Sequence, residues 1–290
     1  MTTAFMQAVD LRSADARVSG ALQPIKTEQT EIQEQGLTFV VRWASSLSAK
    51  DAAKAAMPGG PRDPDFNPFL APEPALTVGP LGDRHVAILN KFPVCDRHLV
   101  LARRQFEEQL APLTLDDFTA LSLIMSESGG LGFYNGGAKA GASQRHKHVQ
   151  WIPTAKGNSS LRFFVSGLPG GLPEQAVAVH PRLPIKHVFV RARCGLGTAV
   201  HASAQSLHQA LGLACRTLGL LPDENGLLPS FNMLADNGWL LVVPRRCEHV
   251  HDISVNALSY GGTLYVRYPE QVETIRRDGP LAVLVQAAYS

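Results

Sequence analysis

The stretch Gly141–Pro153, GASQRHKHVQWIP, decides how the rest of the chain is interpreted. At its centre His146, His148 and Gln150 are spaced two residues apart, and an apolar run closes the stretch. A strand sends every second side chain to the same face of its sheet. We therefore predict a strand on which these three polar side chains project together, with the intervening residues on the opposite face.

Glycines precede this predicted strand at Gly136, Gly137 and Gly141. Because glycine lacks a side chain, such a loop can turn its backbone N–H groups towards a bound anion. Free amides beside two imidazoles suit chemistry on a phosphoryl group, and Arg145 and Lys147 could add positive potential for a polyphosphate. The stretch therefore predicts a phosphate site.

The composition is that of an ordinary globular chain. Its 290 residues are enough for one large domain or two modest ones. The net charge of +2 is too small to predict nucleic-acid binding. No apolar run approaches the roughly 20 residues that span a bilayer, the N-terminus lacks the apolar core of a signal peptide, and the four cysteines are scattered. We expect a cytoplasmic protein without a membrane partner.

Apolar periodicity and turn residues place helices and strands along the chain. Thr114 is a candidate N-cap, with Asp117 at the capping-box position of the helix that follows. Asn237-Gly238 is a strong hairpin signal between two apolar strands. We predict helices at 4–19, 114–128, 199–220 and from 269 onwards, strands at 37–43, 85–92, 98–104, 132–135, 185–192, 231–235 and 239–246, and a proline-rich loop or arm at 57–80.

Two segments of the chain share a spacing. Asn90 precedes an apolar strand and an arginine pair that ends at Arg104, and Asn232 precedes a similar strand and pair that ends at Arg246. The repeat predicts two related αβ halves, although two amphipathic hairpins could also look alike by coincidence. The Gly/Pro-rich stretch 166–175 is the candidate boundary between an N-terminal lobe at 1–170, which carries the histidine strand, and a C-terminal lobe at 171–290.

Neutral imidazole is a good nucleophile near neutral pH, because its ordinary pKa is about 6.5. Attack of one ring nitrogen on phosphorus would divide a difficult displacement into two easier steps, while the other nitrogen donates its proton to an acceptor that fixes the tautomer. A glutamine on the same face could donate an N–H to a non-bridging oxygen as charge develops there. The H-x-H pattern also suits metal ligands or histidines without a chemical role, and the residues alone leave these alternatives open.

Two further patterns resemble zinc half-sites. Cys247, His249 and His251 alternate after the second arginine pair, and a strand there would place all three on one face. Cys95 and His98 form a C-x-x-H pattern. Neither has a fourth ligand at a suitable spacing, so an ordinary turn explains each more simply. We therefore predict no metal site.

The sequence FYNGG followed by GASQRHKHVQ resembles the signature of the ATP adenylyltransferases, also called diadenosine tetraphosphate phosphorylases, of the histidine-triad superfamily. HVAILNKFPVCDRHLVLARRQFEEQLAPLTLDD, SFNMLADNGWLLVVPRR and ISVNALSYGGTLYVR resemble further parts of the same family. In order and spacing the resemblance covers Asn67 to the C-terminus. It implies an α+β fold with a histidine-triad-like, mostly antiparallel sheet, flanking helices and two related halves in one chain.

The resemblance also implies a role for each residue that matches the motif. His148 would be the nucleophile that becomes adenylylated, Gln150 would hold the phosphoryl oxygens, and His146 would order the strand. Gln150 stands where hydrolases of the superfamily have a third histidine, which shifts the expectation from hydrolysis towards transfer. The residues implied in substrate binding are Asn90 at the ribose, its neighbour Lys91, Asn135, Gly141, Ser143 and Gln144 in the phosphate loop, and Lys54 and Arg267 at the polyphosphate, although Arg267 stands where a lysine is expected.

The implied reaction is reversible phosphorolysis of diadenosine tetraphosphate to ATP and ADP through an adenylyl-histidine intermediate. A divalent cation, with Mg²⁺ as the expected ion, would enter with the polyphosphate. Relatives that bind structural zinc do so with cysteines near the N-terminus, and no cysteine precedes Cys95 in this chain, so no structural zinc is expected. The partners would be small molecules, namely diadenosine polyphosphates, ATP, ADP and phosphate, with no nucleic acid, and the protein would be a monomer or homodimer. Two alternatives stay open: a nucleoside-phosphosugar uridylyltransferase-like enzyme and a non-catalytic nucleotide-binding sensor.

Overall fold

The computed structural model describes residues 4–44 and 67–290. Its strands are β1 (Thr27–Glu34), β2 (Leu37–Ala44), β3 (Thr77–Leu81), β4 (His85–Leu89), β5 (Leu99–Arg103), β6 (Leu131–Gly136), β7 (His148–Ile152), β8 (Val177–Ala178), β9 (Val188–Arg191), β10 (Phe231–Asp236), β11 (Trp239–Pro244), β12 (His249–Val250), β13 (Ile253–Ser254) and β14 (Thr263–Val266). Its α-helices are α1 (Ala4–Val18), α3 (Leu115–Ser128), α4 (Arg162–Val165), α5 (Val200–Leu218), α6 (Glu270–Asp278) and α7 (Pro280–Ala287), with short 3-10 helices at Ala138–Ala140 and Ala257–Gly261.

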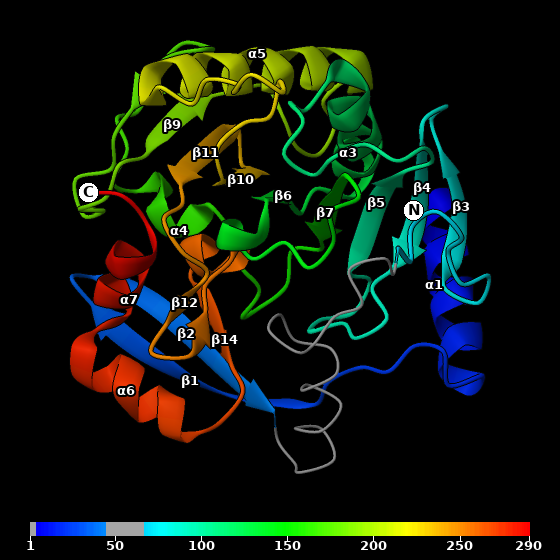
Figure 1. Cartoon of the computed structure of the whole chain (residues 1–290), viewed down its shortest axis with the longest axis horizontal. Coiled ribbons are helices and arrows are strands. Elements are labelled where there is room, and N and C mark those ends of the chain that lie inside the picture. Colours follow the sequence, from blue (N-terminus) through cyan, green and yellow to red (C-terminus); the bar gives the residue numbers. More distant parts are fainter. Residues whose placement is uncertain (1–3, 45–66) are drawn as a thin grey trace.

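Most of these strands belong to one continuous sheet (Figure 1). Within the described residues, nine strands pair in the order β3-β4-β5-β7-β6-β10-β11-β9-β8, and three pair in the order β1-β2-β14. Every neighbour in the large sheet is antiparallel, whereas β14 runs parallel to β2. The mostly antiparallel α+β fold with flanking helices is therefore confirmed.

The local signals in the sequence act as expected. The carboxylate of Asp117 accepts a hydrogen bond from the backbone N–H of Thr114 at 2.7 Å, which closes the capping box at the start of α3. At the β10–β11 hairpin, Asn237 and Gly238 both have positive φ, of 50° and 75°. Such a turn matches the right-handed twist of the strands that it joins.

The large sheet separates two apolar cores. Val149 and Trp151 of β7 point into the first core with α1, α3 and α5, whereas Ile152 points into the second, which the small sheet, α6 and α7 cover. In Figure 1, α3 and α5 lie against the same face of the sheet. Because side chains alternate along a strand, the residues at 148 and 150 lie on the second face.

The two halves of the large sheet repeat a strand-helix-strand-strand unit. β5-α3-β6-β7 and β9-α5-β10-β11 have the same order and the same pairing, and the two units meet where β6 pairs with β10. Asn135 and Asn232 face each other in that pair, with Nδ2 of Asn232 donating to Oδ1 of Asn135 at 2.9 Å. The alignment predicted from Asn90 and Asn232 is wrong, because β10–β11 corresponds to β6–β7 and not to β4–β5.

The large sheet also crosses the candidate boundary at 166–175. Strands from both sides of it pair at β6–β10, and β1–β2 from the start of the chain pair with β14 near its end. The division into lobes at 1–170 and 171–290 stays a prediction. Six strands were not predicted: β1, β3, β8, β12, β13 and β14. Of these, β1 is mostly polar with one buried residue, Ile32, and β3 overlaps the end of the stretch predicted as a loop. No helix in the described ranges is long and apolar enough to cross a membrane.

Candidate active site

His148 begins β7 and presents one ring nitrogen for chemistry. Its Nδ1 lies 2.8 Å from the carbonyl oxygen of His146, so Nδ1 carries the proton that it donates and the lone pair is on Nε2. The side chain is 4% exposed. Burial lowers the pKa of His148 to about 4, so the ring is neutral at neutral pH. The structure thus holds this imidazole in the tautomer and charge state of a nucleophile.

A chain of side-chain hydrogen bonds orients Gln150. Nε2 of His98 donates to Oε1 of Gln150 at 2.9 Å, and Nδ1 of His98 accepts from Nδ2 of Asn90 at 3.2 Å. Burial lowers the pKa of His98 to about 4, so this ring is neutral as well. Because Oε1 of Gln150 is engaged, its NH₂ group is the end that can turn to a ligand.

His146 faces the same side as His148 and ties the strand to its surroundings. Its Nε2 donates to the carbonyl oxygen of Arg103 at 2.8 Å, and its Nδ1 lies 3.1 Å from the side-chain amide of Asn67. The ring of Phe69 packs on both histidines, with centroid distances of 5.9 Å to His146 and 5.0 Å to His148. Phe106, 48% exposed, packs on His146 from another direction at 5.6 Å. Two aromatic rings therefore border the pair.

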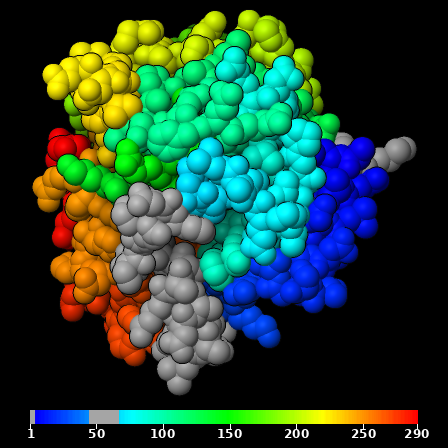
Figure 2. All heavy atoms as spheres, turned by 45° about the vertical axis from the view of Figure 1, so that its right-hand side comes forward, coloured from blue at the N-terminus to red at the C-terminus, as the bar shows by residue number. Residues whose placement is uncertain are grey.

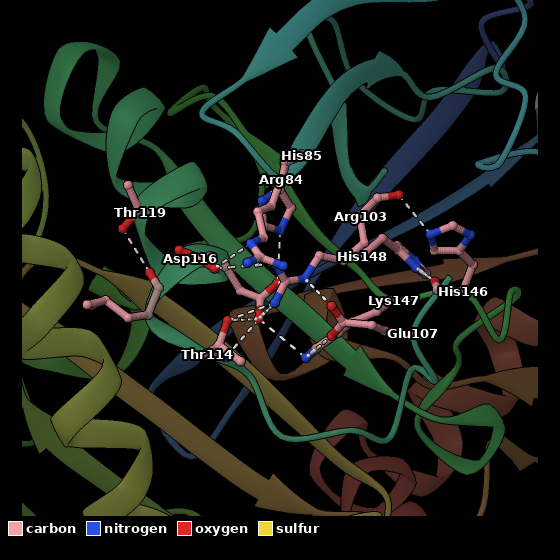
Figure 3. Close-up of polar contacts among 12 residues, drawn as sticks. Arg84, His85, Arg103, Glu107, Thr114, Asp116, Thr119, His146, Lys147 and His148 are labelled. Carbon is pink, nitrogen blue, oxygen red and sulfur yellow. Dashed lines mark hydrogen bonds and ion pairs between the residues drawn. The ribbon is translucent and has the colours of Figure 1, made fainter. Parts of the chain in front are cut away.

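Lys147 points to the opposite face, as the alternation predicts, and its ammonium group is engaged there by acidic and carbonyl groups of the protein. Its side chain is 1% exposed, and Nζ donates to the carbonyl oxygen of Pro112 at 2.7 Å and to Glu107 at 3.1 Å, with Asp117 at 3.4 Å. Figure 3 shows Lys147 directed towards Glu107, away from the ring of His146. Arg145 is exposed and paired with Glu108.

On the side of β7 opposite His148, Asp117 is the centre of a network of buried charged side chains. Its carboxylate lies 3.0 Å from Nε of Arg103 and accepts a hydrogen bond from Nε2 of His85 at 2.9 Å. Burial alone would raise the pKa of Asp117, but the hydrogen bond from His85, the charge of Lys147, the Thr114 N–H and the charge of Arg103 bring it down to about 2. The segment that carries His146 and His148 is thus anchored on its other side by paired charges.

The predicted phosphate loop is largely held by structural contacts. Oδ1 of Asn135 accepts from Asn232 and from the backbone N–H of Ala257, both at 2.9 Å. Gly141 has a φ of 88°, and a Cβ there would lie 2.8 Å from the Cβ of Asn256, so packing alone requires glycine. Ser143 is exposed and Gln144 half-buried at the turn before His146.

The remaining predicted contacts are dispersed. Asn90 lies beside the site through His98. Lys91 is half-exposed and pairs with Glu73 at 3.0 Å. Arg267 follows β14 of the small sheet, with its backbone N–H on Gln271. Lys54 lies outside the described residues.

The second alternating set does not converge. The thiol of Cys247 lies near the carbonyl oxygens of His249 and Gln286, and His251 is 3.4 Å from Asp278. In the described ranges, no group of three or more His, Cys, Asp or Glu side chains could hold a metal ion. His98, the other zinc-like candidate, instead bonds to Gln150.

A cavity of about 600 Å³ adjoins the site through His98. It lies between α1, the turn from β4 to β5 and the residues after β7, and Leu22, Leu89 and Pro153 contribute to its wall. Figure 2 shows this side of the molecule, where α1 (blue) lies against the segment that carries β3 and β4 (cyan). Its volume falls in the range of small-molecule sites, about 300–1,000 Å³.

The sequence interpretation missed Asn67, Phe69, His98 and Gln109 as site residues. His98 was assigned only to a weak zinc pattern, and its distance of 52 residues from Gln150 hides their contact. Asn67 and Phe69 lie in a proline-rich stretch whose apolar residues indicate packing but not a partner. Gln109 carries no sequence signal, since its contacts are with backbone atoms of distant strands.

Comparison with known proteins identifies the family of the chain. Residues 1–166 match the family profile described as the Ap4A phosphorylase N-terminal domain, and residues 181–290 match the ATP adenylyltransferase C-terminal domain. Two relatives from Saccharomyces cerevisiae are diadenosine 5′,5‴-P1,P4-tetraphosphate phosphorylase 2, 27% identical over 91% of this chain and 87% of its own length, and Protein APA1, 30% identical over 87% and 83%.

Solved structures share the fold. Yeast Ap4A phosphorylase Apa2 in complex with AMP superposes with a TM-score of 0.78 at 21% identity, covering 100% of this chain and 98% of the other. Apa2 without that ligand gives a TM-score of 0.80 at 22% identity, with coverage of 100% and 99%. With both of its halves matched, the chain belongs to the family of Ap4A phosphorylases and ATP adenylyltransferases, and it is a nucleotidyltransferase.

Proposed function

We propose that the chain catalyses the phosphorolysis of diadenosine tetraphosphate to ATP and ADP, with His148 as the nucleophile. One observation supports this role above all. The hydrogen bond from Nδ1 of His148 to the carbonyl oxygen of His146 leaves the Nε2 lone pair available on a neutral ring. Family membership supports the substrate, since the relatives include diadenosine tetraphosphate phosphorylase 2 of yeast.

The proposed reaction has two displacements at the same phosphorus. Nε2 of His148 attacks the α-phosphate, the bond from this phosphorus to the bridging oxygen breaks, and ATP leaves. Inorganic phosphate then attacks the adenylyl group, the P–N bond breaks, and ADP leaves with His148 restored. Run in reverse, ATP and ADP give the dinucleotide. The intermediate converts one difficult step into two.

Gln150 is proposed to stabilise charge on the transferred phosphoryl group. Its Oε1 accepts from His98, so its NH₂ can donate to a non-bridging oxygen. A neutral amide at this position, unlike a histidine, cannot serve as a general base for water, which favours transfer over hydrolysis. His98 and Asn90 hold this amide in place.

The cavity beside His98 is proposed to take the adenosine of the transferred group. It combines apolar walls at Leu22 and Leu89 with a rim of two ion pairs, Arg17–Asp96 at 2.5 Å and Arg97–Asp10 at 2.7 Å. An apolar wall with a few oriented polar groups is what a purine and ribose need.

The remaining components are small molecules. A divalent cation, with Mg²⁺ as the expected ion, is proposed to arrive with the polyphosphate, whose oxygens are its natural ligands. Arg267, Lys54 and Lys91 stay proposed polyphosphate contacts. All four cysteines are free thiols, which supports a reducing, cytoplasmic location. The protein is proposed to act as a monomer or homodimer.

Product analysis tests the proposal. With diadenosine tetraphosphate, Mg²⁺ and phosphate, equal amounts of ATP and ADP should form, and their formation should require phosphate. AMP in place of ADP, independent of phosphate, would establish hydrolysis instead. Tight nucleotide binding without turnover would establish a sensor, and turnover of nucleoside-phosphosugars with hexose phosphate would establish a uridylyltransferase.

A further inference from the structure

The pairing between strands β6 and β7 ends just before His148. They pair from Leu131 opposite Ile152 to Phe133 opposite Gln150. The same register would place Asn135 opposite His148, but the ladder has ended there. At this point β6 stays paired with β10 through Asn135, whereas β7 stays paired with β5, where Ala102 lies opposite His148.

The side-chain amide of Gln109 occupies the opening between the two strands. Its Oε1 accepts from the backbone N–H of His148 at 2.8 Å, and its Nε2 donates to the carbonyl oxygens of Asn135 at 2.8 Å and of His148 at 3.1 Å. The amide therefore takes the place that a peptide group of β6 would have in a continuous ladder. Gln109 is 2% exposed, and its backbone N–H donates to the carbonyl oxygen of Arg145.

The direction of the nucleophile depends on this main chain. The ring of His148 is fixed by the carbonyl oxygen of His146, which belongs to the same short segment of backbone. On the β5 side, the segment is held by the Arg103 N–H on the carbonyl oxygen of Lys147 at 3.0 Å. Gln109 holds the same segment on the β6 side. A shift of the His148 backbone, and with it of the ring, would therefore break the hydrogen bonds of the Gln109 amide.

We propose that Gln109 is a positioning residue for adenylyl transfer, which sets the separation between the backbone of His148 and that of Asn135 and thereby aims Nε2 at phosphorus. The inference rests on the proposed function of His148. Displacement of a reacting atom by about 1 Å can cost about 100-fold in rate. The side chain of Gln109 bonds to backbone atoms and is 2% exposed, so substrate binding should be spared.

Gln109→Met tests the inference, because methionine has a similar length and makes none of the three hydrogen bonds. We expect kcat for phosphorolysis to fall by about 10- to 100-fold while KM changes by less than about threefold. The rate of adenylyl-enzyme formation in a single turnover should fall by the same factor. Gln175→Met is the matched control, since Gln175 bonds to Ser206 away from the site, and its kcat should stay that of the wild type.

Gln109→Glu keeps the test decisive if the methionine variant fails to fold. A carboxylate can accept from the His148 N–H but cannot donate to the two carbonyl oxygens, whereas a protonated carboxyl can donate once. Burial beside carbonyl oxygens raises the pKa of such a carboxyl. The ratio of variant to wild-type kcat should therefore rise as the pH falls from about 8 to about 5.5.

Two results would overturn the positioning role: a pH-independent ratio for Gln109→Glu, or a Gln109→Met enzyme with wild-type kcat and raised KM. Both are read on wild-type enzyme that performs phosphorolysis. If the wild type itself forms no ATP and ADP, the proposed function has failed, which is a separate outcome from failure of the role of Gln109.

Discussion

Replacing Asp117 with asparagine would remove the buried carboxylate that Lys147 and Arg103 share. Asparagine has the same shape, and its Oδ1 can still accept the Thr114 N–H that caps α3. The substitution therefore removes the charge and keeps the helix cap. It also leaves two buried cations beneath the strand that carries His148, because Lys147 is 1% and Arg103 is 4% exposed.

The cost follows from the pKa of the carboxyl. It falls from its ordinary value of 3.8 to about 2 in the folded protein. Since one pKa unit corresponds to about 1.4 kcal/mol, the ionised group contributes about 2–3 kcal/mol to folding at neutral pH. Breaking a buried ion pair by removing one partner typically costs about 3–5 kcal/mol. We expect Asp117→Asn to lower the free energy of unfolding at pH 7 by about 2–5 kcal/mol.

The same pKa fixes the pH dependence. Because the folded pKa lies below the unfolded one, the contribution is fully present above about pH 4 and is lost as the pH falls through about 2. Urea denaturation of both proteins at several pH values measures it, and their difference in stability should shrink below about pH 4. Asp116→Asn is the control, because that side chain is 54% exposed and lies 3.7 Å from Arg103. It should cost less than about 1 kcal/mol. Equal losses in the two variants would refute the reasoning.

Three further predictions concern the site. Burial lowers the pKa of His148 to about 4, so single-turnover adenylylation should keep its rate from pH 8 down to about 5.5, and a fall below about 6.5 would mean that the ring titrates as an exposed histidine does. His98→Ala releases Gln150, so kcat should fall about tenfold and combine less than additively with Gln150→Ala, as measured in a double-mutant cycle; full additivity would mean that His98 does not act through Gln150. Gly141→Ala should destabilise the protein by about 1–3 kcal/mol in thermal unfolding, whereas Gly170→Ala, with nothing within 4 Å of the added Cβ, should change little; similar losses would contradict the packing argument.

The local structure could be predicted because it depends on neighbours in sequence. The capping box of Thr114 and Asp117 and the turn at Asn237-Gly238 are each written in four residues or fewer. The rings of His146 and His148 lie on one side, next to Phe69, as the alternation predicts, although β7 begins only at His148. In each of these cases, the backbone geometry alone determines in which direction the side chains at a given sequence spacing point.

The tertiary arrangement of the site could not be predicted in the same way. Lys147 was expected to add positive potential for a polyphosphate, because a lone lysine beside histidines gives no sign of a buried carboxylate 30 residues earlier. Asn135 looked like a loop ligand, but its oxygen is engaged by Asn232 and Ala257 from the second half of the chain. The predicted repeat matched the wrong hairpins, since pairing order and not residue similarity defines the two halves.

The central claim is that His148 carries the adenylyl group, and one measurement tests it most directly. Wild-type enzyme and His148→Ala are incubated without phosphate with diadenosine tetraphosphate labelled at the α-phosphate, and the label on the protein is followed in acid and in base. Wild-type protein should carry label that acid releases and base does not, as a P–N bond behaves, and added phosphate should convert it to ADP. The variant should carry none. Label that persists in His148→Ala, or an active wild-type enzyme that never becomes labelled, would contradict the mechanism.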